Sequence, residues 1–279
     1  MSHSRSDRAH TTLVCLALVA VAMLLATPLR LRAQQRGGRG GAPAGPPPTG
    51  QGVAPIDVTG YWVSAIVDEW RFRVSPQKGD ILYLPLNPEA RRLANAWDPA
   101  KDEAEGKACK AYGAVGVMQR PGRLHITWDN PDTLKIEADA GTQTRTIHFG
   151  PAPAAPGPPS WQGNSSANWR VNGRVLIDTG GIGLVPALRQ SGTSTSGTLT
   201  IVTTNMLPGY IRKNGVPYSD KAVLTEHVNR LTGQQNDVYL SVTAMVEDPT
   251  YLTQPFVRTY TFKKQADAAG WEPTPCWNR

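Results

Sequence analysis

Side-chain alternation with a period of two runs through most of the chain after Asp57, and this feature constrains the fold most. In RLHITW the apolar Leu124, Ile126 and Trp128 alternate with polar residues, which places the three side chains on one face of a strand. The alternation recurs, between turn-forming residues, in LKIEADA, QTRTIHF, TLTIVTT, AVLTEHVNRL, DVYLSVTAMVE and FVRTYTFKK. With SWQGNSSANW and a first strand in GYWVSAIVDEWRFR, this makes about nine strand candidates. Long helical patterns do not alternate with them, so we predict a mainly β fold rather than a parallel α/β sheet.

The first strand candidate is long, because Trp62, Ile66, Trp70 and Phe72 share one parity. One or two short helices are expected after it. Asn87 with Pro88 has the pattern of a helix N-cap and first position, and Asp98 with Pro99 repeats it toward Cys109.

The N-terminal residues 1–33 have the pattern of an export signal, with basic residues followed by an apolar run from Leu13 to Ala26. That run is short compared with the roughly 20 residues of a spanning helix, so we expect no integral membrane association after cleavage. Residues 34–55 are rich in Gly and Pro and are predicted to form a flexible linker. Residues 56–279 would then form a single domain, and 172–197 would be a loop insertion.

Charge and cysteine usage agree with a periplasmic or extracellular protein. The chain has a formal charge of +7, but the signal and linker carry much of it. The folded part shows no basic stripe between aromatic residues, so no nucleic-acid partner is expected. Cys109 and Cys276 remain as an even pair after signal removal, and in an oxidising compartment we expect a disulfide between them, with two free thiols as the alternative.

Two short motifs resemble those of lipocalins and fatty-acid-binding proteins. Thr59-Gly60-Tyr61-Trp62 is similar to the G-x-W that opens the first strand of calycins, and Arg258-Thr259-Tyr260 resembles the R-x-Y on the last strand of fatty-acid-binding proteins. The resemblance implies an antiparallel up-and-down barrel, a ligand carboxylate held by Arg258 and Tyr260, and Trp62 at the barrel floor. A cation from Arg258 or Lys263 could instead pack on the Trp62 ring, which would give Arg258 a structural role.

A second resemblance covers nearly the whole exported part. Segments such as SWQGNSSANW, LTIVTTNMLPGYIRKNGVPYSDKAVLTEHVNRL and VEDPTYLTQPF look like a group of functionally uncharacterised secreted proteins of soil bacteria. That resemblance implies a location and a β-rich fold, and it implies no reaction.

Several further side chains are candidates for ligand binding or acid–base chemistry. Trp62, Trp70 and Trp128 would give an apolar lining suited to a hydrophobic or aromatic molecule. Arg230 could bind an anion, and Glu226, His227 and His125 are the acid–base candidates. Alternation puts Glu226 and His227 on opposite faces of their strand. The alternative for each is a structural or solvent-facing side chain.

Metal and nucleophile motifs are missing. His125, His148 and His227 lack the spacing of a local metal site, and WQGNSS lacks the second glycine of a nucleophile elbow. We therefore expect no metal and no cofactor.

The leading hypothesis is an exported β-barrel that binds a small hydrophobic or amphipathic molecule. The first alternative is a cofactor-free lyase, hydratase or isomerase that uses the acid–base residues in the barrel pocket. The second is a structural periplasmic or surface module with a solid barrel. Fold alone does not choose among them, and whether the chain is an enzyme stays open.

Overall fold

The computed structural model of the chain describes residues 48–150, 157–172 and 196–277. The expected signal, most of the linker and the middle of the 172–197 insertion lie outside these residues. The described residues from Pro48 onward belong to one compact unit.

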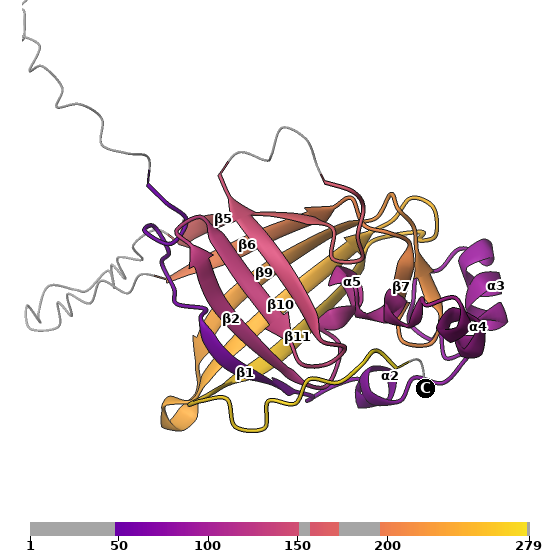
Figure 1. Ribbon diagram of the computed structural model, residues 1–279, viewed down its shortest axis with the longest axis horizontal. Coiled ribbons are helices and arrows are strands. Elements are labelled where there is room, and N and C mark those ends of the chain that lie inside the picture. The colour runs from indigo at the N-terminus through magenta and orange to yellow at the C-terminus, as the bar shows by residue number, and fades with distance from the viewer. Residues whose placement is uncertain (1–47, 151–156, 173–195, 278–279) are drawn as a thin grey trace, which may run out of the picture. The chain divides into compact units, whose positions relative to one another are not determined.

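Nine strands close into a barrel (Figure 1). Alternation predicted the strands, and the resemblance to calycins implied the closed barrel. Around the barrel they follow the order β1-β11-β10-β9-β6-β5-β4-β3-β2. Their bounds are β1 Gly60–Ala65, β2 Arg123–Asn130, β3 Thr133–Ala138, β4 Gln143–Phe149, β5 Asn164–Asn172, β6 Ser196–Thr204, β9 Val223–Thr232, β10 Val238–Glu247 and β11 Phe256–Gln265. Closure pairs β1 with both β2 and β11, which leaves no unpaired edge in the barrel.

One strand pair departs from the expected antiparallel order. β4 and β5 run parallel, with Ile147 opposite Ser165 and Phe149 opposite Ala167. β4 and β5 therefore begin at the same end of the barrel and do not form a hairpin. The barrel is therefore mixed rather than purely antiparallel, and it otherwise matches the mainly β barrel that was predicted.

Apolar side chains fill the middle of the barrel. Leu224 and Val228 of β9, Leu199 and Ile201 of β6, and Val242 of β10 are all buried, and they belong to one continuous hydrophobic cluster. The same alternation that predicted the strands puts these residues on the inner face. The wall is thus stabilised from inside by packed side chains.

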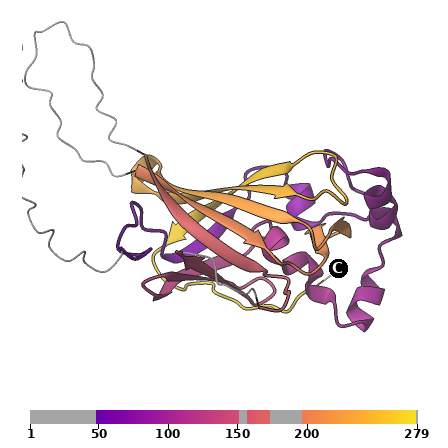
Figure 2. The ribbon, with the colours of Figure 1, turned by 90° about the horizontal axis from the view of Figure 1, so that it is seen from above.

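The helices gather at one end of the barrel, which we call the cap end (Figures 1 and 2). They lie in the connection from β1 to β2, and their bounds are α2 Trp70–Val74, α3 Pro88–Ala96, α4 Pro99–Ala104, the 3₁₀ helix η1 Ala108–Tyr112 and α5 Ala114–Val117. The connection from β6 to β9 adds a small two-stranded ribbon, β7 Gly209–Arg212 and β8 Val216–Tyr218. We define the cap as residues 66–122 and 205–222. A further 3₁₀ helix, η3 Gln234–Asn236, joins β9 to β10 at the other end, which we call the floor.

The two predicted helix starts are confirmed. The Asn87 side chain accepts a hydrogen bond from the Ala90 amide at 2.9 Å, and Asp98 accepts one from the Ala100 amide at 3.0 Å. Each satisfies an amide that the first helical turn leaves free. The second helix ends at Ala104, and Cys109 lies in the separate η1.

The first strand is shorter than its alternation predicted. β1 ends at Ala65, and Trp70 is exposed and lies on helix α2 rather than on a strand. Glu69 precedes that helix with a φ of 48°, a left-handed conformation that interrupts an extended chain. Trp161, expected on a strand, lies in the turn before β5.

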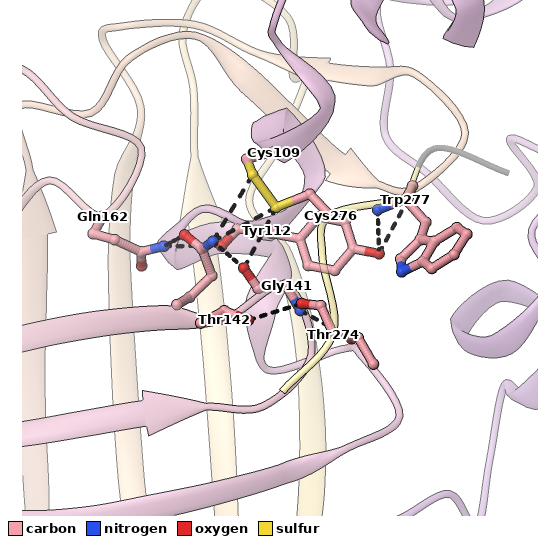
Figure 3. Close-up of a disulfide and its surroundings, with 9 residues drawn as sticks. Cys109, Tyr112, Gly141, Thr142, Gln162, Thr274, Cys276 and Trp277 are labelled. Atoms are coloured by element: carbon pink, nitrogen blue, oxygen red, sulfur yellow. Dashed lines mark hydrogen bonds between the residues drawn. A yellow bond between two sulfur atoms is a disulfide. The ribbon is translucent and has the colours of Figure 1, made fainter. Parts of the chain in front are cut away.

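The C-terminal segment returns from the floor along the outside of the barrel and is fastened to the cap (Figures 1 and 3). Cys276 forms the predicted disulfide with Cys109 of η1, across a sequence separation of 167 residues. Thr274 donates from its amide to the Asp139 carbonyl at 2.9 Å. The Trp277 amide donates to the Tyr112 hydroxyl at 3.2 Å. The last described residues therefore join the cap to the β3–β4 turn.

Candidate functional site

A buried ion pair lies inside the barrel, and it includes the acid–base candidate Glu226. Both Glu226 oxygens accept hydrogen bonds from Arg145 of β4, at 2.7 and 3.1 Å. Arg145 also donates to the Thr203 hydroxyl at 3.2 Å, and Thr203 is hydrogen-bonded to Ser165 at 2.8 Å. Four neighbouring strands thus supply one polar side chain each. Glu226 is engaged by a bidentate partner, and that arrangement is typical of a structural pair.

The structure does not bring the histidine candidates to Glu226. His227 lies on the opposite face of β9 and is 3.2 Å from the Thr200 hydroxyl. His125 is on β2, where it stacks on Tyr61 with ring centroids 4.1 Å apart and contacts Glu137 at 3.2 Å. Within the described ranges, no group of three histidine, cysteine or acidic side chains is placed to hold a metal ion.

Trp62 lies at the floor of the barrel and is fully buried. Its indole donates to the Val58 carbonyl at 3.0 Å, and the Lys264 ammonium lies 5.3 Å from its ring centroid. The cation on the ring therefore comes from the last strand, as expected, but it is Lys264 rather than Arg258 or Lys263. Lys263 instead pairs with Asp237 at 2.7 Å.

The other expected lining residues near the floor pack against protein side chains. Trp128 is partly buried with its ring centroid 5.2 Å from that of Phe149, and Phe149 stacks on Trp169 at 5.8 Å. Arg230 is exposed near the end of β9. These contacts make Trp128 part of the core and place Arg230 on the surface.

Tyr260 and Arg258 lie at the cap end, where side chains of the cap reach the barrel. Tyr260 is buried, and burial raises the pKa of its hydroxyl. The Arg73 guanidinium lies 5.2 Å from the centroid of the Tyr260 ring. Arg258 is paired with Glu69 at 2.9 Å and lies 4.8 Å from the Phe256 ring centroid. The two residues of the R-x-Y motif are therefore close to further cations from the cap.

Three arginines of the cap are buried around this end of the barrel: Arg73 at 3% exposed, Arg120 at 4% and Arg212 at 1%. Arg73 donates to the Ser64 hydroxyl at 3.2 Å, and its Nη1 lies 3.7 Å from Asp68, beyond hydrogen-bonding distance. Arg212 donates to the Leu82 carbonyl at 3.3 Å. We call Arg73, Arg120 and Arg212 the arginine cluster.

Arg120 is the least compensated member of the arginine cluster. Among the described residues, its Nε and Nη2 atoms have no hydrogen-bond partner. Burial lowers the pKa of its guanidinium to about 10, and the neighbouring Arg73 and Arg212 act in the same direction while Tyr112 and Tyr260 oppose it. A buried charge is normally paired, so Arg120 departs from the usual pattern of a buried arginine.

Large apolar side chains are exposed in residues 67–83, the segment that contains Arg73 of the arginine cluster. Val67, Trp70, Val74, Leu82 and Tyr83 are all exposed. An ion pair of 2.8 Å between Arg71 and Asp80 brings the two ends of this segment together. We call residues 67–83 the apolar segment. None of the helices in the described part of the chain has the length and apolar character that crossing a membrane requires.

Sequence reasoning did not select the arginine cluster. Each member follows apolar residues or lies beside a turn, in RFRV, GVMQRPG and GYIRKN. Alternation assigns faces only to strands of the barrel wall. Arg73 and Arg120 belong to the connection between β1 and β2, and strand alternation does not predict how that connection packs. The only sequence signal for these residues was an arginine among apolar neighbours.

The nine-stranded barrel is consistent with the calycin-like fold that the two motifs implied, although the packed interior differs from the open pocket expected of a ligand carrier. Comparison of the chain with protein-family models, with curated proteins and with solved structures finds no match.

Proposed function

We propose that this chain is an exported β-barrel protein that binds a small amphipathic molecule at the cap end, with an anionic group beside Arg120 and Tyr260. The observation that carries this proposal is the buried Arg120 guanidinium, whose Nε and Nη2 lack partners among the described residues. A carboxylate or phosphate oxygen would accept charge-assisted hydrogen bonds from these two atoms. It would also neutralise a charge whose burial otherwise costs several kcal/mol.

The neighbouring groups support an anion rather than a cation. Arg73 and Arg212 are both close enough to lower the pKa of Arg120, so the local field is positive. Glu69 is already paired with Arg258. An incoming anion would therefore meet three buried cations and a tyrosine hydroxyl, which agrees with the carboxylate expected for Arg258 and Tyr260.

The apolar part of the ligand would lie outside the barrel wall. Packed side chains occupy the barrel interior, so a long apolar tail has no room beside Trp62 or Trp128. The apolar segment offers exposed Trp70 and Val74 within a few residues of Arg73. A ligand with its head at the arginine cluster could cover these side chains and remove their apolar surface from water.

Export is part of the proposal. The N-terminal pattern of residues 1–33 predicts a signal, and the Cys109–Cys276 disulfide suits an oxidising compartment such as the periplasm or the extracellular space.

A second candidate function is a structural periplasmic or surface module. The filled barrel interior favours it, because a solid barrel needs no ligand to be stable. The enzyme alternative receives less support, since Glu226, His227 and His125 do not meet in one pocket.

Calorimetric titration with decanoate and with decanol tests the proposal. Decanoate should bind the wild type, and Arg120→Met should weaken it about 10- to 100-fold, the range for charge-assisted hydrogen bonds. Decanol affinity should change little. Arg230→Met is the matched control, because Arg230 is exposed near the floor.

No decanoate binding, or equal affinity in wild type and Arg120→Met, would exclude the anion site and favour the structural module. Native mass spectrometry of the purified protein, followed by organic extraction, should in turn recover an anionic amphipathic compound. Recovery of only neutral compounds would also count against the site.

A further inference from the structure

Exposed apolar side chains gather in the apolar segment, residues 67–83. Five large apolar side chains of this segment are exposed, with Val67 at 81%, Trp70 at 68% and Tyr83 at 72%. The other exposed large apolar side chains of the described residues occur singly along the chain: Val53, Val171, Leu207, Leu231, Val257 and Trp277. Single exposed apolar residues are normal on a protein surface, whereas a group of them marks a binding surface.

Buried contacts hold the two parts of the apolar segment together. The buried Arg212 guanidinium lies 4.2 Å from the centroid of the buried Phe72 ring and donates to the Leu82 carbonyl at 3.3 Å. Phe72 belongs to helix α2, so this contact joins the helix to the stretch around Leu82. Trp70 of α2 and Leu82 are therefore exposed on neighbouring parts of one surface, and Figure 1 shows α2 at the margin of the cap end.

Tyr83 is held in an unfavourable backbone conformation at this surface. Its φ is 61°, in the left-handed region, which costs a bulky residue roughly 1–2 kcal/mol. Its ring is largely exposed, so little packing offsets that cost. Strained residues of this kind occur most often at binding and catalytic sites. The exposed ring of Tyr83 is therefore a candidate contact for a partner.

The charges of the apolar segment leave a surplus cation. Each of its three acidic residues faces an arginine, at 3.7, 2.9 and 2.8 Å respectively: Asp68 with Arg73, Glu69 with Arg258, and Asp80 with Arg71. Lys78 is exposed and takes part in no ion pair of the described residues. The carboxylates of the segment are thus compensated, and Lys78 remains to attract an anion.

A pocket of about 300 Å³ continues this surface beyond α2. It is lined by residues 74–78, Trp97 and Lys213, so two of its described lining residues are lysines and none is acidic. We call it the lysine pocket. Val74 is exposed and belongs to both the apolar segment and the lysine pocket. Apolar side chains and ammonium groups therefore lie side by side at this end of the molecule.

We infer that the cap end docks on the surface of an anionic phospholipid membrane. Trp70, Leu82 and Tyr83 enter the layer between head groups and acyl chains, and Lys78 and Lys213 contact lipid phosphates. Tryptophan and tyrosine are typical of that layer, because each combines an apolar ring with a polar group that stays hydrated. A lysine at an anionic membrane surface contributes about 1 kcal/mol.

The size of the surface favours a membrane over a protein partner. A stable protein interface has roughly 20–30 residues on each side and a matching shape. The apolar segment presents five large apolar side chains on a five-residue helix and the turns after it. Binding at a membrane interface depends on buried apolar area and on charge, and needs no matching shape.

This inference goes beyond the proposed function. It uses the same apolar segment as the proposed ligand, but it does not depend on the anion site at Arg120. Docking would bring that site close to a source of anionic amphipathic molecules.

Co-sedimentation with vesicles tests the inference. The chain from Gln34 onward is used, because it lacks the apolar run of residues 13–26 and keeps the compact unit that begins at Pro48. It should bind mixed vesicles of phosphatidylcholine and phosphatidylglycerol more tightly than vesicles of phosphatidylcholine alone. Trp70→Ser should weaken binding to both about 5- to 10-fold, because one large apolar side chain no longer leaves water. Lys78→Gln should weaken binding to the mixed vesicles alone, about fivefold.

The matched controls lie at the floor. Leu231→Ser removes an exposed apolar side chain and Arg230→Gln an exposed cation, both near the end of β9, and neither should change vesicle binding. Arg120→Met should also leave it unchanged, because that guanidinium is buried. The same variant should weaken decanoate binding, so failure of the anion site and failure of membrane docking give different outcomes.

Four results would overturn the inference. The first is no binding to either kind of vesicle, and the second is equal binding to both kinds. The third is an equal loss in Trp70→Ser and Leu231→Ser, which would show that binding does not use the apolar segment. The fourth is a dimer in analytical ultracentrifugation that Trp70→Ser dissociates, without vesicle binding, which would assign the surface to a second copy of the chain.

Discussion

Arg145 and Arg120 are both almost completely buried, and their surroundings differ. Arg145 inside the barrel meets Glu226 through two hydrogen bonds and Thr203 through a third. Arg120 at the cap end has no partner for Nε or Nη2 among the described residues. Both side chains are shielded from water, but only Arg145 is hydrogen-bonded to a carboxylate. The charge of Arg145 is therefore compensated inside the barrel, although its Nε has no partner among the described residues, and the proposed anion would compensate the charge of Arg120.

The different positions of the two arginines explain this contrast. Arg145 lies on β4 and Glu226 on β9, and the β5 and β6 strands between them supply Ser165 and Thr203. Barrel closure fixes the spacing of these four side chains. Arg120 lies between α5 and β2, in a connection that no ladder of strand hydrogen bonds holds in register. Function is commonly found in such connections, on a rigid scaffold.

The largest expected effect comes from breaking the ion pair between Arg145 and Glu226. Glu226→Gln should lower the free energy of unfolding by about 3–5 kcal/mol, because it leaves the Arg145 guanidinium buried and unpaired. Urea denaturation measures this loss. The double variant Arg145→Met with Glu226→Leu is the control and should lie much closer to the wild type, since it removes both charges. If Glu226→Gln were as stable as the wild type, this result would contradict a structural role for the Arg145–Glu226 pair.

The disulfide comes next, because it joins the cap to the C-terminal segment. Cys276→Ser should lower the free energy of unfolding by about 2–5 kcal/mol, since the bond closes a loop of 167 residues. Wild type under reducing conditions should match the variant. Hydrogen exchange should show faster exchange in η1 and in the segment around Thr274 than in β9 and β10. Uniform loss of protection over the whole barrel would show that the cap and the wall are not distinct in stability.

Removing the unpaired charge of Arg120 should raise the free energy of unfolding rather than lower it. Arg120→Met should raise the free energy of unfolding of the ligand-free protein by about 1–3 kcal/mol, because a buried cation without a counter-ion is replaced by an apolar side chain of similar length. Thermal and urea denaturation of matched samples measure the gain. Arg145→Met serves as the contrast and should destabilise. Loss of stability in Arg120→Met would show that the guanidinium makes stabilising interactions despite its unpartnered Nε and Nη2 atoms.

The smallest effect concerns alkaline pH. Burial raises the pKa of the Tyr260 and Tyr218 hydroxyls above the ordinary tyrosine value. Above about pH 10 the unfolded state therefore loses these protons while the folded state retains them, and stability should fall by about 1 kcal/mol per pH unit for each residue. Below that pH the two residues contribute no pH dependence.

Urea denaturation at pH 9, 10 and 11 measures this slope. Tyr260→Phe should reduce it, because this variant removes one of the two buried hydroxyls. An identical slope in Tyr260→Phe and wild type would contradict the prediction. Because Tyr260 lies beside the arginine cluster, a slope that changes when decanoate is added would link this titration to the anion site.

Local pattern alone determined much of the scaffold. Alternation identified the strands of the wall and put Glu226 and His227 on opposite faces, because the period of two follows from the backbone of a single strand. Asn87 and Asp98 marked helix starts through contacts with amides three or two residues away. The Cys109–Cys276 pair followed from an even count of cysteines in a chain that the N-terminal pattern predicts to be exported. The strand and helix signals act within a few residues, and the cysteine argument depends on the predicted compartment.

Tertiary structure alone decided the rest. The parallel pairing of β4 with β5, the partner of Glu226, and the cation on Trp62 all depend on which strands become neighbours when the barrel closes. The arginine cluster depends on how two long connections pack on one end of that barrel. Such contacts join residues far apart in sequence, where local backbone preference has no influence. Only the complete packing of wall and cap specifies that Arg145 is paired and Arg120 is not.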